Sequence, residues 1–212
     1  MNGTRATGGV RAQRGGLGPV RTAVACATLA CLVLTGASCA PPEPSPGGSG
    51  APERTGAPRV DEPLATEAKR AYPCASLTDA QAVAAGAPPG TEHRALHDGT
   101  GAACLWEPEA SAEGAKIAVS WPSDTPDLDV LYGLRDEQAY FEETTLQGYP
   151  AVFANQNDRR DRHCVLYVGV SDDAVFSTAV DTFGEDGAPG PCDAARKAAG
   201  SVVDNLRRNP AA

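Results

Sequence analysis

CVLYVGVSDDAVFSTAV, residues 164–180, is the stretch that decides the fold. Its first part, residues 164–170, is apolar on both faces, which is typical of a strand buried at the centre of a sheet. The pair Asp172-Asp173 predicts a turn, and residues 174–180 supply an apolar partner strand. The stretch therefore predicts a β-hairpin in the middle of an antiparallel sheet.

Further strands are expected on the N-terminal side of this hairpin. Asp98-Gly99 is a hairpin turn signal between two short runs, and Ile117, Val119 and Trp121 alternate with smaller or polar side chains. Another short strand is expected after Gly148-Tyr149-Pro150. The expected strands are residues 92–98, 102–107, 115–122 and a segment around 151–154.

Helix signals complete the pattern. Thr78 followed by Gln81 is a capping-box pattern that opens a short helix ending before Gly86. Asp127 is expected to cap a helix over the following residues, with its apolar stripe formed by Leu128, Leu131 and Leu134. The last helix spans about 193–208, with its apolar stripe formed by Ala195, Ala198, Ala199, Val202 and Leu206. The sequence thus predicts an α+β domain with a mostly antiparallel sheet of about six strands and two or three helices.

Residues 1–38 have the features of a secretory signal peptide. Residues 1–22 carry four Arg and no acidic residue, and the apolar run 23–35 is followed by small residues. The run has 13 residues, where about 20 are needed for a helix to span a bilayer. We therefore expect an exported protein without a permanent transmembrane helix.

Cys39 is the expected lipidation site. Cleavage before it leaves an N-terminal Cys, as in a bacterial lipoprotein, and Pro41-Pro42 suits an ordinary signal peptidase poorly. The position three before Cys39 is Gly36, where lipoproteins normally have Leu or Val. We expect a lipoprotein on the outer face of the cytoplasmic membrane, bound to the membrane by this N-terminal anchor. A plain protein secreted to the medium is the alternative.

The mature chain is expected to consist of a tether and one domain. Residues 39–70 are rich in Pro and Gly towards their N-terminal end and are expected to form a lipid-anchored, disordered tether. A proline-rich docking motif is the alternative there. Residues 71–212 are expected to form a single α+β domain. They hold 22 acidic and 10 basic residues, a net charge of −12, which argues against a nucleic-acid partner.

Four cysteines remain in the expected domain: Cys74, Cys104, Cys164 and Cys192. An even set in an exported domain predicts two disulfides, for which three connectivities are possible. We favour Cys74–Cys104, tying the segment before the first helix to the strand at Trp106. The second pair is then Cys164–Cys192, tying the central strand to the terminal helix. Zinc is the alternative, but no two of these cysteines lie within a few residues of each other.

The order of motifs resembles a known family. Pro-Cys (73–74), Leu-Thr-Asp-Ala-Gln (77–81), Cys-Leu-Trp (104–106), Gly-Tyr-Pro-Ala (148–151), Cys-Val-Leu-Tyr-Val (164–168) and Cys-Asp-Ala-Ala (192–195) follow one another before a final helix. This order is similar to an actinobacterial lipoprotein family, domain of unknown function family 3558. The resemblance implies a surface lipoprotein with paired disulfides and a Mog1/PsbP-like α+β fold. It implies no established activity.

The sequence indicates no catalytic, cofactor or metal site. It has no Gly-x-Ser-x-Gly, His-Glu-x-x-His or phosphate-loop motif. His93 and His97 would share the face of a strand but lie about 13 Å apart, and His163 is expected at a strand end. The acidic group Asp124, Asp127 and Asp129 lacks the Gly and terminal Glu of a calcium loop, and Glu142-Glu143 carries no glycosidase pattern.

One charged loop stands out in the acidic domain. Arg159, Arg160 and Arg162 alternate with Asp158 and Asp161 and form its densest basic cluster. A solvated loop is the first interpretation, and a binding site for an anionic partner is the alternative.

These observations predict a non-enzymatic extracellular binding module for an envelope protein, a peptide or a wall component. A small-ligand or lipid carrier is the first alternative, and it requires an apolar cavity of several hundred Å³. An unrecognised enzyme is the second, and it requires converging titratable groups in a cleft. The sequence makes no prediction of the oligomeric state.

Overall fold

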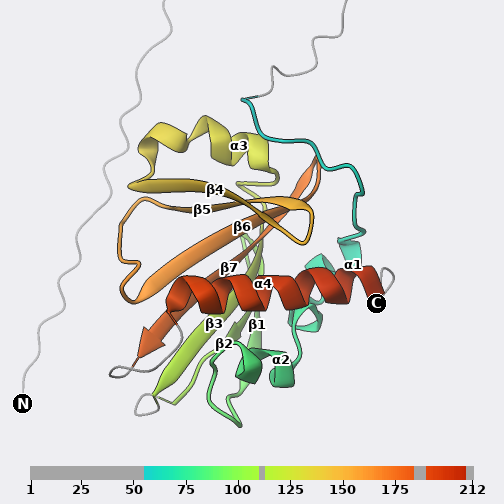
Figure 1. Ribbon diagram of the computed structural model, residues 1–212. Coiled ribbons are helices and arrows are strands. Elements are labelled where there is room, and N and C mark those ends of the chain that lie inside the picture. The colour runs from blue at the N-terminus through green and yellow to red at the C-terminus, as the bar shows by residue number, and fades with distance from the viewer. Residues whose placement is uncertain (1–54, 110–112, 184–189, 209–212) are drawn as a thin grey trace, which may run out of the picture. The chain divides into compact units, whose positions relative to one another are not determined.

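Figure 1 shows the computed structural model of the protein, which describes residues 55–109, 113–183 and 190–208. These residues form an antiparallel sheet of seven strands, together with four α-helices and two short 3₁₀ helices. The strands are β1 (His93–Asp98), β2 (Gly101–Trp106), β3 (Gly114–Pro122), β4 (Tyr140–Leu146), β5 (Tyr149–Asn155), β6 (His163–Ser171) and β7 (Ala174–Phe183). The helices are α1 (Glu67–Ala71), η1 (Pro73–Ser76), α2 (Asp79–Ala84), α3 (Leu128–Gly133), η2 (Arg135–Glu137) and α4 (Pro191–Arg208). The predicted α+β class is confirmed, with one strand more than expected.

The sheet is built from two runs of neighbouring strands that meet in the middle. Its order is β1-β2-β3-β7-β6-β5-β4, and every neighbouring pair is antiparallel. The chain passes from the β1 edge to β3, crosses to the β4 edge, and returns through β5 and β6 to β7. The hairpin predicted from residues 164–180 is therefore β6–β7, and β7 is the central strand. The strand that we did not predict is β4, at the far edge.

The main core lies between one face of the sheet and α4. Figure 1 shows α4 running across the front of the sheet. The whole predicted stripe of this helix is buried, and it packs on the side chains of the central strands. Strand β3 contributes Ile117, Val119 and Trp121, all fully buried, whereas the side chains between them face the opposite side and are partly exposed. The alternation seen in the sequence thus corresponds to the two faces of the sheet.

A smaller core lies on the opposite face, under α3. Asp127 caps this helix as expected, since its carboxylate accepts a hydrogen bond from the Val130 amide. Leu128 packs closely on Gly169 of β6, where the missing side chain makes room for it. Leu131 and Tyr132 pack with Val152, Ala154 and Val175 in the same cluster. Helix α3 therefore covers the β5–β6 side of this face.

Residues 55–70 differ from our expectation of a disordered tether over 39–70. They lie along the domain as a strap, which we define as residues 55–66, and lead into α1. Asp172 accepts hydrogen bonds from the Val60 amide and the Arg59 guanidinium, and the Leu64 amide donates to the Val170 carbonyl. The Tyr149 hydroxyl donates to the Glu62 carbonyl. The strap is thus held by groups far away in the sequence, which explains why local composition did not predict it.

Both predicted disulfides are present, Cys74–Cys104 and Cys164–Cys192. The first joins η1 to β2, and the second joins β6 to the first turn of α4. The signal peptide predicted over residues 1–38, the lipidation site Cys39 and tether residues 40–54 lie outside the described residues. Within the described part of the chain, no helix is both long and apolar enough to cross a membrane.

Candidate functional site

The predicted basic cluster is largely neutralised by its surroundings. The guanidinium of Arg160 donates to both carboxylate oxygens of Asp158, at 2.7 and 2.9 Å, and also forms an ion pair with Glu142. It lies 4.4 Å from the centroid of the Tyr140 ring. These acidic partners raise the pKa of Arg160 above its ordinary value. The Arg160 guanidinium is therefore engaged within the domain.

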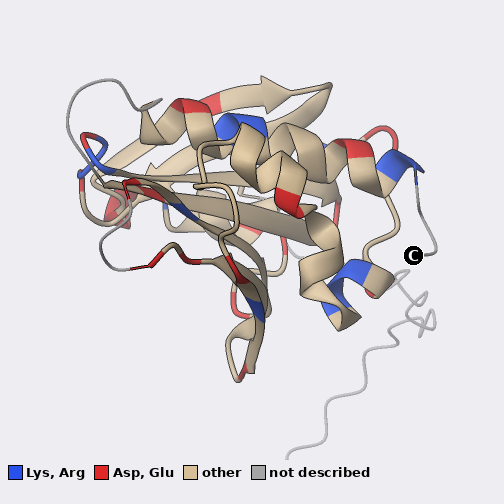
Figure 2. Ribbon diagram, turned by 90° about the horizontal axis from the view of Figure 1, so that it is seen from below, with Lys and Arg blue, Asp and Glu red and all other residues tan. Residues whose placement is uncertain are grey.

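The two other arginines of that loop are less engaged. Arg162 pairs with its neighbour Asp161 at 3.3 Å, and both side chains are exposed. Arg159 has no side-chain partner among the described residues. Figure 2 shows basic and acidic positions next to one another along the charged loops. Arg159, Arg160 and Arg162 are therefore neighbours along the chain, but their guanidinium groups do not converge on a common binding site within the described residues.

The three histidines lie at separate places in the described structure. His93 and His97 are on the α4 side of edge strand β1, and His97 has no side-chain partner among the described residues. His163 is on the opposite face of the sheet, where Asp181 lies 2.8 Å from Nδ1 and the Asn155 amide lies 3.3 Å from Nε2. No group of three or more metal-ligating side chains occurs within the described residues.

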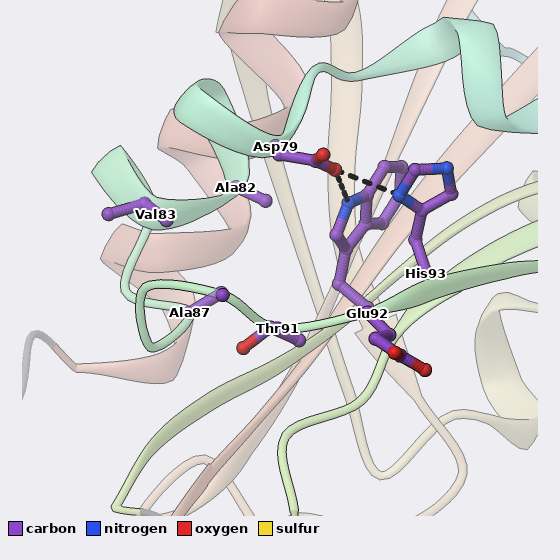
Figure 3. Close-up of a pocket in the computed structure, with 9 residues that line it drawn as sticks. Asp79, Ala82, Val83, Ala87, Thr91, Glu92 and His93 are labelled. Carbon is purple, nitrogen blue, oxygen red and sulfur yellow. Dashed lines mark hydrogen bonds and ion pairs between the residues drawn. The ribbon is translucent and has the colours of Figure 1, made fainter.

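A pocket between α2 and β1 is the best-organised candidate site. We call it the α2–β1 pocket, and it has a volume of about 390 Å³. Figure 3 shows it in close-up, with Asp79 and His93 pointing toward each other. Its lining residues are Asp79, Ala82, Val83, Ala87, Gly90, Thr91, Glu92, His93 and Trp106.

Local sequence signals place the acidic group of this pocket. Thr78 and Gln81 form the complete capping box, which fixes the first turn of α2 and puts Asp79 at its first position. The disulfide Cys74–Cys104 ties the segment before α2 to β2. In the β1–β2 ladder His93 pairs with Trp106, so both rings lie on the same face, 5.6 Å apart.

The carboxylate of Asp79 joins these elements. One of its oxygens accepts a hydrogen bond from the Trp106 indole N–H at 3.0 Å and lies 2.8 Å from His93 Nδ1. The hydrogen bond from Trp106 and the contact with His93 hold the pKa of Asp79 below its usual value. Because 66% of the Asp79 side chain remains exposed, an ionised carboxylate is presented to solvent in a fixed position.

The remaining walls of the pocket contain both apolar and polar side chains. Ala82, Ala87 and Trp106 are buried and form an apolar floor, and Val83 is exposed at the side. The hydroxyl of Thr91 donates to the Pro88 carbonyl at 2.7 Å and is thereby engaged in holding the loop. A second pocket of about 440 Å³ shares Gly90, Thr91 and Glu92 and adds Glu107 and Glu109. The two pockets together form a surface region with an apolar floor and carboxylates at its rim, of which Glu107 is paired with Lys116 at 2.7 Å and with Arg94 at 3.2 Å.

No motif in the sequence pointed directly to this site. The capping box that carries Asp79 was predicted, but Asp79 lies 14 residues from His93 and 27 residues from Trp106. Only the antiparallel β1–β2 ladder and the disulfide bring the three residues together.

Comparison with known protein families identifies a match. A family model described as "Protein of unknown function (DUF3558)" matches residues 22–205. No curated protein and no solved structure matches the chain. The expected likeness to Mog1/PsbP-like folds therefore stays a prediction.

Proposed function

The chain belongs to the DUF3558 family of proteins of unknown function, and we propose that it is a non-enzymatic binding module of the cell envelope. In this proposal it is an actinobacterial lipoprotein, exported and acylated at Cys39. Its α2–β1 pocket takes up a basic group of an envelope protein or peptide.

Several features support export and anchoring. The apolar run 23–35 and Cys39 both lie inside the region that the family model matches. Two disulfides crosslink the domain, and disulfides persist in oxidising compartments outside the cytoplasm. The chain between Cys39 and the strap has the Pro- and Gly-rich composition of a spacer. Such a protein reaches its partner at the outer surface of the membrane.

The fixed carboxylate of Asp79 is the observation that carries the ligand assignment. It lies beside an apolar floor and next to Val83, so a ligand with an aliphatic stem and a cationic end matches both parts of the pocket. Lysine and arginine side chains have this form, because their methylene stems pack on apolar surface while the charged end remains polar. The net charge of −12 over residues 71–212 also favours encounter with a basic partner.

Neither alternative function gains support from a specific observation. A carrier needs an apolar cavity, whereas the described pockets lie at the surface and all contain acidic residues. A hydrolase that uses the Asp79–His93 pair needs a nucleophile at the second imidazole nitrogen. Among the described residues, no hydroxyl or thiol is hydrogen-bonded to that nitrogen.

A peptide titration tests the proposal. The exported protein with Cys39→Ser is titrated with a short lysine-containing peptide and, separately, with the same peptide acetylated at the lysine amine. We expect amide and indole shifts at Val83, His93 and Trp106 with the first peptide only. Asp79→Asn should weaken binding by about tenfold, because it removes the charge while keeping a hydrogen-bond acceptor for Trp106.

Asp136→Asn is the matched control for this titration. Asp136 is an exposed carboxylate on η2, outside the pocket, and its substitution should leave the affinity unchanged. Equal affinity for the acetylated peptide, or equal weakening by both substitutions, would show that the pocket does not recognise a cation.

A further inference from the structure

Strand β1 forms an open edge of the sheet beside the α2–β1 pocket. The strand order places β1 at one end, with β2 as its neighbour, and all six of its residues are exposed. Within the described residues, no segment outside the β1–β2 hairpin hydrogen-bonds to the backbone of β1. The unpaired N–H and C=O groups of such an edge are a template on which a further strand can pair.

The register shows which backbone groups of β1 point outward. Glu92 and Glu107 continue the β1–β2 pairing by one position, and the Glu107 amide donates to the Glu92 carbonyl. Because bonded and non-bonded pairs alternate in an antiparallel ladder, every second residue from Glu92 onward bonds to β2. The residues between them therefore direct their N–H and C=O groups away from β2. These outward residues are His93, Ala95 and His97.

None of the usual protections covers this edge. Natural edge strands are shielded by a proline, a bulge or free charges, whereas β1 contains no proline and its pairing with β2 is regular over all six residues. Arg94 pairs with Glu107 at 3.2 Å, and Asp98 accepts hydrogen bonds from Thr100 in the turn. An approaching strand therefore meets open backbone groups.

The open edge and the α2–β1 pocket share His93. Its backbone belongs to the edge, whereas its ring projects toward Asp79, whose carboxylate lies 2.8 Å from Nδ1 (Figure 3). Residues directly opposite each other in neighbouring strands have their side chains on the same face, with Cβ atoms about 5 Å apart. A residue that pairs with His93 in an added strand therefore directs its side chain toward the pocket.

From this geometry we propose that the partner segment binds as an additional antiparallel strand on β1, with a lysine or arginine opposite His93. The inference rests on the proposed function, because that cationic side chain is the group that Asp79 takes up. Antiparallel pairing matches every other pair of the sheet. The net charge of −12 over residues 71–212 selects a basic segment over an acidic one.

In this arrangement the edge recognises the main chain and the pocket recognises one side chain. The backbone of the added strand bonds to the outward groups of β1, which supplies affinity without regard to sequence. Its side chains alternate between the pocket face and the opposite face. Binding therefore requires an extended backbone as well as a cation.

Hydrogen exchange measured by NMR on the exported protein with Cys39→Ser tests this geometry. The probe is a capped peptide of alternating valine and threonine with one central lysine. At a peptide concentration about ten times the Kd, exchange of the three outward amides of β1 should slow about tenfold, since each donates to the peptide. The amides of Arg94 and Leu96 already bond to β2, so their exchange should change little.

Two N-methylated peptides separate the strand from the pocket. The first is methylated on the lysine amide and on the amides two residues away, all of which face β1 in the proposed pairing. The second is methylated on the intervening amides, which face away. We expect the first peptide to bind about tenfold more weakly than the unmethylated peptide, and the second to bind nearly as well.

Ala95→Pro tests the edge from the side of the protein. The proline removes an outward donor and obstructs the added strand, but it takes no bond from the β1–β2 ladder. We expect about tenfold weaker binding of the lysine peptide. Ala95→Ser keeps the amide and is the matched control, with unchanged affinity. The midpoint of thermal unfolding checks that both variants are folded, and the methylated peptides decide the question without any variant.

The outcomes distinguish this inference from the proposed function. Equal binding of the peptide acetylated at its lysine amine would overturn the cation pocket and the added strand together. Lysine-dependent binding that leaves the outward amides unprotected, with both methylated peptides binding alike, would overturn the added strand alone. Protection of these amides without peptide, rising with protein concentration, would assign the edge to a second copy of the chain and would also overturn the inference.

Discussion

Asp79 and Arg160 are both held by neighbouring side chains, but in different ways. Arg160 is bound by Asp158 and Glu142, so its charge is compensated within the domain. Asp79 is held by the indole N–H of Trp106 and by the imidazole of His93. Exposed ion pairs contribute little to folding stability. The contacts of Asp79 therefore orient its carboxylate but add little to the free energy of unfolding.

Tyr132 gives a residue-scale prediction for alkaline stability. Its hydroxyl donates to Glu143 at 3.0 Å, and burial together with this carboxylate raises the pKa of Tyr132 to about 12. The folded state thus holds the phenolic proton more tightly than the unfolded state, whose tyrosine pKa is about 10. The stabilisation is complete below about pH 10 and is lost as the pH rises through about 12.

Tyr132→Phe should abolish this contribution. We expect a loss of about 1 kcal/mol at neutral pH from the missing hydrogen bond. We also expect a shallower fall in stability above about pH 10 than in the unchanged protein. Urea unfolding at neutral and alkaline pH measures both quantities. Parallel alkaline curves for the two proteins would contradict the role assigned to this hydroxyl.

The two disulfides close loops of similar length but fix different parts of the domain. They close loops of 30 and 28 residues, so chain entropy alone predicts nearly the same stabilisation for each, about 3–4 kcal/mol. Cys164–Cys192 fixes α4 on the main core, whereas Cys74–Cys104 fixes the segment that leads into α2 and the α2–β1 pocket.

Replacing each pair by alanines should therefore separate stability from binding. Both double variants should lose about 3–4 kcal/mol in urea unfolding. Only Cys74→Ala with Cys104→Ala should also weaken the lysine-peptide interaction under conditions where both variants are folded. Equal peptide affinity in the two variants would show that the disulfide does not position the pocket.

Elements with a strong local pattern were predictable from the sequence. The β6–β7 hairpin, strand β3 and helix α4 each bury an apolar face. In each of them the spacing of the apolar residues is recognisable within a short segment of sequence. Strand β4 was missed because it is an edge strand with Glu142 and Glu143 at its centre, and edge strands tolerate charge. The strap was missed because distant groups, such as the Val170 carbonyl and Asp172, hold it.

On the scale of the whole molecule, the strap determines where the chain leaves the domain. Thr55 contacts Asp129 on α3 through its backbone amide and its hydroxyl. Figure 1 shows α3 and the start of the strap at one end of the domain and α2 at the opposite end. In the proposed lipoprotein, a tether that ends at Thr55 would leave the α2–β1 pocket on the far side from the attachment point.

The anchor itself gives a prediction for the exported protein. Intact mass of the protein from the membrane fraction should show acyl chains on an N-terminal Cys39, together with two disulfides that disappear on reduction. Cys39→Ala should release the protein into the medium, because stable anchoring requires the acyl chains. An unmodified mature protein that starts elsewhere, recovered from the medium, would contradict the lipoprotein assignment.

Site-specific photo-crosslinking on intact cells tests the binding-module account most directly. A photoreactive amino acid is placed at Val83 in the α2–β1 pocket or, as a control, at Val130 on α3. The two side chains are 38% and 36% exposed, so they are equally available for chance contacts. We expect a discrete crosslinked product from Val83 that is lost with Asp79→Asn and absent from Val130. Equal products from both positions, or a product from Val83 that persists with Asp79→Asn, would contradict it.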